Sequence, residues 1–228
     1  MNRLRIPLRL TAALASLLIP SAALHAQLVS ARAVVTAPHS SVRFGQGVER
    51  AGGVWGGLEM GLRAGRLTLL GSGARGRLTP EGGFLARTVG EVALAGRYDV
   101  LPWLGAETRY LVRAAKSAVG YQRWELWGVG ARVLHQMGGP GVVASAGLVY
   151  SPVAKVTGIE DPTLALSADV GISLVPETLP LQIGLNYRTE RYRFPSAAGR
   201  SEQFEAFTLA LGLGVRRERG RWTLRGGR

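Results

Sequence analysis

The sequence contains no cysteine and only two lysines, Lys116 and Lys155, among its 228 residues. Without cysteine the chain has no disulfide framework, no thiolate nucleophile and no residue for the acyl anchor of a lipoprotein. After residue 26 it also lacks any continuous apolar run long enough for a membrane-spanning helix. Between the two termini the charges are of mixed sign with no single basic face, and no recognisable nucleic-acid-binding motif is found, so we expect no nucleic-acid partner.

The N-terminus has the three parts of an export signal. Arg3, Arg5 and Arg9 form a basic region, an apolar stretch follows, and small residues ending at Ala26 precede Gln27. We predict a signal peptide over 1–26, whose removal lowers the formal charge from +13 to +10 because it carries three arginines and no acid. We expect 27–40 to be an N-terminal periplasmic segment and 216–228 to be a basic C-terminal tail.

Apolar and polar residues alternate along much of the remaining chain. Over 164–174, leucine, alanine, valine and isoleucine hold one parity, while Ser167, Asp169 and Ser173 lie on the other. The pattern resumes over 181–187 after a turn bounded by prolines. A period of two residues is typical of a β-strand with one apolar and one polar face.

Short turns recur at an almost constant interval. Their centres lie near 64, 101, 138, 177 and 217, so the spacings are 37, 37, 39 and 40 residues, with a longer polar loop in each interval. This order predicts an all-β, up-and-down antiparallel transmembrane β-barrel over 41–215, with short periplasmic turns and longer external loops. Ten strands are expected, at 41–50, 53–62, 66–75, 89–100, 103–115, 121–134, 141–152, 163–175, 180–193 and 203–215. Eight strands starting at 66 are the alternative, which leaves 53–62 without a partner.

The composition of the polar parity indicates which face meets water. A soluble barrel would carry long side chains of mixed charge there, whereas this chain has mainly glycine, serine and alanine with a few acids and arginines. Such residues suit a crowded lumen, where buried ions need partners. We predict ion pairs of Glu107 with Arg109 or Arg113, and of Arg188 with Glu190. The predicted polar network of the lumen comprises Glu59, Arg63, Glu91, Arg97, Glu107, Arg109, Arg113, Asp169, Asn186, Arg188 and Glu190.

Aromatic residues fall near the ends of the predicted apolar faces. Outer-membrane barrels carry aromatic girdles at both membrane interfaces. The segments 122–125 (QRWE) and 191–194 (RYRF) combine arginine with aromatics at predicted outer ends. We interpret them first as girdle, and second as sites where arginine contacts lipopolysaccharide phosphates. The interfacial aromatic residues predicted from the strands are Tyr98, Trp103, Tyr110, Tyr150, Tyr187 and Phe207.

In signal peptide, alternation and hairpin spacing, the chain resembles the small bacterial outer-membrane β-barrel proteins, in the size class of the OmpA transmembrane domain and OmpX. The resemblance covers about residues 41–215 and is one of pattern. It implies an outer-membrane location, contact with outer-membrane lipid and lipopolysaccharide, and insertion by the barrel-assembly machinery. One departure is the C-terminus, which ends LRGGR where such proteins commonly end on an aromatic residue. Phe207 or Trp222 would replace that residue, or the tail is a periplasmic extension.

Few residues suit catalysis. His39 and His135 are the only histidines after the predicted signal peptide, and neither has a metal-binding partner at the usual spacing. No run of acids matches a calcium-binding loop. We predict no catalytic, cofactor or metal site, and a non-enzymatic barrel with a structural or surface-interaction role. A narrow channel for small solutes or lipids is the alternative; a lipid-A-modifying enzyme or a soluble ligand-binding barrel is less favoured.

Overall fold

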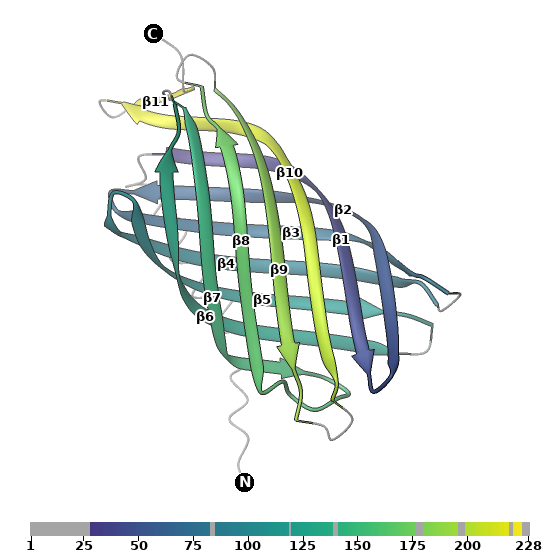
Figure 1. Ribbon diagram of the computed structural model, residues 1–228. Coiled ribbons are helices and arrows are strands. Elements are labelled where there is room, and N and C mark those ends of the chain that lie inside the picture. Colours follow the sequence, from purple (N-terminus) through teal and green to yellow (C-terminus); the bar gives the residue numbers. More distant parts are fainter. Residues whose placement is uncertain are drawn as a thin grey trace, which may run out of the picture.

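The chain folds into a single antiparallel sheet that closes on itself (Figure 1). The computed structural model describes residues 28–82, 85–118, 120–138, 141–176, 180–195, 199–218 and 221–224. Strands pair in sequence order, and the first also pairs with the tenth, from Leu28 opposite Arg216 to Arg43 opposite Ser201. The predicted ten-stranded up-and-down barrel is therefore confirmed. The predicted signal peptide over 1–26 lies outside the described residues.

The strands are long, between 11 and 18 residues in the barrel. A short eleventh strand pairs with the end of β10 beyond the closed part. No helix among the described residues is long and apolar enough to cross a membrane. The strands are β1 (Leu28–Phe44), β2 (Gly47–Ala64), β3 (Leu67–Pro80), β4 (Arg87–Leu101), β5 (Leu104–Lys116), β6 (Tyr121–Gln136), β7 (Val142–Val156), β8 (Leu164–Leu174), β9 (Leu181–Arg193), β10 (Ser201–Glu218) and β11 (Arg221–Leu224).

The first strand differs from the prediction. The expected strand at 41–50 spans a hairpin turn, and residues 28–40, predicted to be a periplasmic segment, belong to β1. Proline lacks an N–H donor, so a proline within a segment usually argues against a β-strand there. Pro38 nevertheless lies in the middle of β1. The pairs between β1 and β2 run from Leu28 to Thr36 and resume at His39, so the ladder tolerates the proline with a local gap. The predicted basic tail also contributes backbone to β10 and β11.

The barrel has two unlike ends. At the end that we call the loop end, β1 and β2 meet in a tight turn and the other connections lie at 81–86, 117–120, 157–163 and 194–200. At the opposite turn end lie the connections 65–66, 102–103, 137–141 and 175–180, together with the start of β1 and the end of β10. Gly45 and Gly65 begin two of the three two-residue turns with φ of 51° and 59°, a left-handed backbone that favours glycine.

The two faces of the sheet separate as the alternation predicted. On β4, Val92 and Leu94 face outward and are 59% and 51% exposed, whereas Glu91 on the same strand faces the lumen and is only 9% exposed. The outward parity is apolar on other strands of the barrel as well. Its exposed large residues include Val35, Val54, Leu58, Met60, Leu148, Val170, Ile172, Leu185, Leu209, Leu211 and Leu213. An apolar exterior around a polar lumen is the inverse of a soluble barrel.

Candidate functional site: the barrel lumen

The lumen is crossed on its loop-end side by four charged residues that we call the loop-side quartet: Glu91, Arg113, Arg188 and Glu190. Arg113 donates from Nε and Nη2 to Glu91 at 2.8 and 2.6 Å, and from Nη2 to Glu190 at 2.8 Å. Arg188 donates to the second oxygen of Glu91 at 2.9 Å. Tyr192 adds a hydrogen bond from its hydroxyl to Glu190 at 2.6 Å. Two guanidinium groups and two carboxylates thus neutralise one another away from water.

A second set, the central quartet, lies nearer the turn end and comprises Glu107, Arg109, Arg132 and Asp169. Arg132 donates to both carboxylate oxygens of Asp169 at 2.7 and 2.8 Å and from Nε to Glu107 at 2.8 Å. Arg109 lies 3.3 Å from Glu107 and 3.6 Å from Asp169. The paired geometry of Arg132 fixes the orientation of both acids. This quartet also has no net charge.

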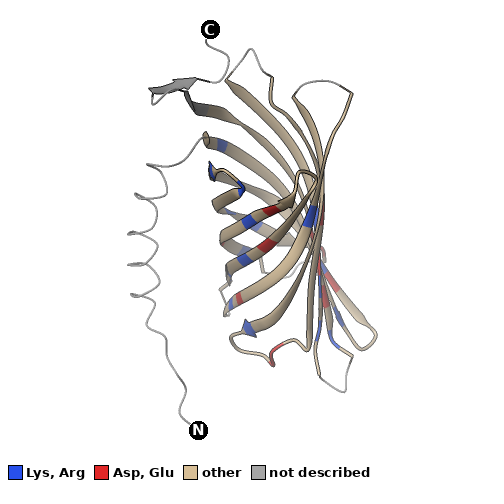
Figure 2. Ribbon diagram, turned by 90° about the vertical axis from the view of Figure 1, so that its left-hand side faces the viewer, with Lys and Arg blue, Asp and Glu red and all other residues tan. Residues whose placement is uncertain are grey.

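Smaller ion pairs extend the network towards both rims. Near the turn end Asp99 accepts from Arg97 at 2.9 Å and from Arg63 at 3.1 Å. Arg32 pairs with Glu59 in the same half of the barrel. At the loop end the pairs are Glu49 with Arg87 and Arg200 with Glu202. Figure 2 shows how basic and acidic residues lie on adjoining strands.

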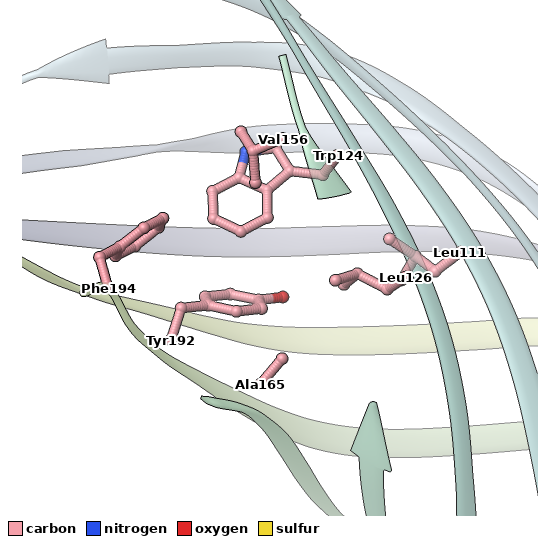
Figure 3. Close-up of a cluster of buried hydrophobic side chains, with 7 residues drawn as sticks. All are labelled: Leu111, Trp124, Leu126, Val156, Ala165, Tyr192 and Phe194. Carbon is pink, nitrogen blue, oxygen red and sulfur yellow. The ribbon is translucent and has the colours of Figure 1, made fainter. Parts of the chain in front are cut away.

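Apolar and aromatic side chains surround the loop-side quartet. One cluster, drawn in Figure 3, packs Trp124 of β6 against Tyr192 of β9, with ring centroids 4.6 Å apart. The other packs Trp55 of β2 against Phe204 of β10 at 5.5 Å. Both tryptophans are buried. The barrel interior at this level is therefore filled from several strands by side chains that exclude water.

The quartet separates two cavities. The outer cavity, at the loop end, measures about 440 Å³, and Arg113, Trp124 and Phe204 are among its lining residues. The inner cavity, towards the turn end, measures about 360 Å³, and Arg188 lines it together with the central quartet. Glu91 binds Arg113 on one side and Arg188 on the other. The quartet is therefore the partition of the lumen.

Every residue of the predicted lumen network lies in the ion pairs above except Asn186, which donates to Asp169 at 3.4 Å. Arg188 is paired with Glu190 at 3.3 Å and Arg109 with Glu107, as predicted. The alternative pairing of Arg113 with Glu107 is wrong, because Arg113 lies nearer the loop end of β5 and pairs with Glu91 and Glu190 instead. The predicted network did not include Arg32, Asp99, Arg132 or Tyr192, although Asp99 shares the polar parity of Glu91 and Arg97. Arg132 was detectable, since it shares its parity with Gly128 and Gly130 and alternates with Val129 and Val133.

The predicted interfacial aromatics lie on the outer surface. Tyr98 and Trp103 are each 52% exposed near the turn end. Tyr110, Tyr150 and Phe207 are outward and exposed, and Tyr187 packs on Phe207 with centroids 4.7 Å apart. The girdle interpretation of QRWE and RYRF is wrong for their aromatics. Trp124, Tyr192 and Phe194 point into the barrel and are only 5%, 3% and 8% exposed, because their parity is that of the lumen.

Neither histidine shares the parity of the lumen-facing residues on its strand. His39 is on β1 in its loop-end half, and His135 is exposed near the turn end of β6. Within the described ranges, no three histidines or acids are arranged to hold a metal ion.

A closed antiparallel barrel with an apolar exterior and neutralised charges inside has the architecture of a small bacterial outer-membrane β-barrel, the class that the sequence pattern resembles. No protein-family model matches the chain, and no curated protein matches its sequence.

Several solved structures are similar to this chain in outline. The translocator domain of the autotransporter NalP from Neisseria meningitidis is 11% identical, with a TM-score of 0.45, covering 90% of this chain and 97% of that one. Neisserial surface protein A is 13% identical, with a TM-score of 0.36 and coverages of 82% and 97%. The attachment invasion locus protein Ail of Yersinia pestis is 11% identical, with a TM-score of 0.35 and coverages of 81% and 97%.

Proposed function

We propose that the protein is a non-enzymatic outer-membrane β-barrel whose lumen is closed to solutes and whose role is structural or surface-interacting. The observation that carries this proposal is the loop-side quartet, in which Glu91 bridges Arg113 of the outer cavity and Arg188 of the inner cavity. A solute passing along the barrel would have to separate these groups. Removing one partner of a buried ion pair typically costs about 3–5 kcal/mol.

The outer-membrane location follows from the outer face. A band of exposed leucine, valine and isoleucine surrounds the barrel, and in water such a continuous apolar surface would drive aggregation. Export by the predicted signal peptide, insertion by the barrel-assembly machinery and contact with lipopolysaccharide belong to the same proposal. The proposal includes no nucleic-acid partner.

A non-enzymatic role is supported by the separation of the reactive groups. The carboxylates of the lumen are each occupied by one or more arginines, and His39 and His135 lie on other parts of the barrel. A general base needs a free lone pair near its substrate. A carboxylate held by two guanidinium groups is a poor candidate for that task.

The second candidate is a narrow channel. It is favoured by the two cavities, which lie on either side of the loop-side quartet. Movement of Arg113 or Arg188 towards its own cavity would join them.

Planar lipid bilayers distinguish the two candidates. We expect the purified full-length barrel to give no discrete conductance steps at moderate voltage. Reproducible single-channel steps of one size would overturn the closed lumen and support the channel. Cell fractionation is the companion test: the protein should partition with outer membranes and migrate differently on gels before and after heating.

A further inference from the structure

Arginines on the two faces of the barrel differ in their partners. Those directed into the lumen, such as Arg97, Arg113 and Arg132, are ion-paired with carboxylates. Six outward arginines at the loop end form no ion pair with any described residue, and all six are exposed. They are Arg43, Arg50, Arg75, Arg77, Arg191 and Arg193.

These six residues, which we call the arginine sector, occupy one side of the barrel. Arg191 and Arg193 lie on β9, Arg43 on β1 and Arg50 on β2, with the remaining two on β3. The strands β9, β10, β1, β2 and β3 are consecutive around the barrel because β10 pairs with β1. The parity confirms their direction: Tyr192 between the β9 pair, and Leu78 next to Arg77, are buried in the lumen.

An apolar surface continues from the sector towards the turn end on the same strands. Leu185 on β9, Leu209 on β10 and Leu58 on β2 are 55%, 54% and 67% exposed. The described acids beside the sector are Glu81, Glu205 and, in the connection before β8, Glu160 and Asp161. Glu205 accepts hydrogen bonds from Tyr187 and Gln203, and Asp161 accepts one from the Val156 amide. None of these four acids is ion-paired with the sector. The sector therefore presents unneutralised positive charge directly above a lipid-facing apolar band.

A ligand complementary to this surface needs closely spaced negative groups, which would contact the arginines, joined to several apolar chains, which would contact the apolar band. Phosphate suits exposed guanidinium groups, which bind its oxygens in pairs. The loop end faces the outer leaflet in the proposed orientation, since short turns are periplasmic in such barrels. We propose that the arginine sector binds the phosphorylated headgroup of the outer-leaflet glycolipid, lipid A, whose acyl chains lie along β9, β10, β1 and β2. This inference rests on the proposed outer-membrane location and not on the closed lumen.

Native mass spectrometry of the folded full-length barrel tests the inference, with bis-phosphorylated lipid A as the probe. The test variant combines Arg50→Gln, Arg75→Gln and Arg77→Gln. Each basic residue near a charged membrane surface contributes enough that three together should weaken binding roughly tenfold to hundredfold. Lipid A stripped of both phosphates should bind the unaltered barrel about as weakly, which checks the inference even if the variant does not fold.

Two matched substitutions control for charge and place. Arg66→Gln removes an exposed arginine at the turn end, and Arg123→Gln removes one at the loop end that is already paired with Glu125 at 2.8 Å. Both should bind lipid A like the unaltered barrel. Equal binding by the triple variant, or equal binding of phosphate-free lipid A, would overturn the inference. Displacement of lipid A by millimolar inorganic phosphate, or equal binding of phosphatidylglycerol, would show a general anion surface and overturn it as well. Conductance plays no part in any of these outcomes, so a failure here is distinct from a failure of the closed lumen.

Discussion

The guanidinium carbon of Arg113 lies 3.8 Å from the centroid of the Phe204 ring. One cation therefore contacts an aromatic face while its nitrogens bind Glu91 and Glu190. Cation–π attraction strengthens as water is excluded. The contact joins the loop-side quartet to the apolar cluster around Trp55, so ionic and apolar packing support each other.

Replacing Glu190 by glutamine should destabilise the barrel. Glu190 is 2% exposed and binds Arg113, Arg188 and Tyr192, so the substitution leaves buried positive charge uncompensated. We expect the free energy of unfolding to fall by about 3–5 kcal/mol, measured by urea titration of the barrel in lipid vesicles. Glu160→Gln in the exposed loop is the control and should change it by less than about 0.5 kcal/mol. Equal effects of the two substitutions would contradict the buried network.

Arg132 and Asp169 should show strong energetic coupling, because two hydrogen bonds of 2.7 and 2.8 Å join them. In a double-mutant cycle with Arg132→Met and Asp169→Leu, we expect a coupling energy of about 1–3 kcal/mol. The same Arg132→Met change combined with Glu190→Gln should be additive within about 0.5 kcal/mol, since those residues share no bond. Additivity in the first cycle would count against the paired geometry.

Trp124 and Trp127 should report opposite faces of β6. Trp124 is 5% exposed and inward, whereas Trp127 is 46% exposed on the outer surface. In two variants that keep one of these tryptophans and replace the others by phenylalanine, brominated phospholipid should quench the fluorescence of Trp127 strongly and that of Trp124 weakly. The opposite order would mean that the apolar exterior does not face lipid.

Opening the partition should create conductance. The combined change Glu91→Ala and Arg188→Ala removes one acid and one cation, so net charge is preserved while the group between the cavities is deleted. We expect discrete steps in planar bilayers where the unaltered barrel gives none. Glu49→Ala with Arg87→Ala is the matched control, because that pair lies in the mouth of the outer cavity. Silence in both variants would place the barrier elsewhere in the lumen.

The alternation was enough to predict the faces and most of the strands, because in a barrel parity determines whether a side chain meets lipid or lumen. Nine of the ten predicted strands overlap β2 to β10. The first was misplaced since Pro38 interrupts the pattern that identifies β1. The choice of ion-pair partners was less predictable. Glu91 lies directly opposite Arg113 on the neighbouring strand, but its bond to Arg188 crosses from β4 to β9, a contact that depends on the width of the lumen.

The same limit explains the aromatics of QRWE and RYRF. Composition showed that arginine and aromatic residues occur together in these segments. It did not show that consecutive residues of a strand face opposite sides, which directs Trp124 and Tyr192 into the lumen. Their neighbours Arg123 and Arg191 point outward. In a strand, adjacent residues of one motif serve opposite sides of the wall.

The pairing of β1 with β10 determines when the barrel can close during folding. Leu28 pairs with Arg216, so the partners are 188 positions apart (216 − 28) and β1 waits for almost the whole chain before its second edge is occupied. Contacts this distant in sequence form slowly, and an unoccupied strand edge invites pairing with other chains. A chain that stopped before Ser201 would leave one edge of β1 and one edge of β9 open at the same time, although β1 would still pair with β2 and β9 with β8. We therefore expect the barrel to be most prone to aggregation before β10 is in place.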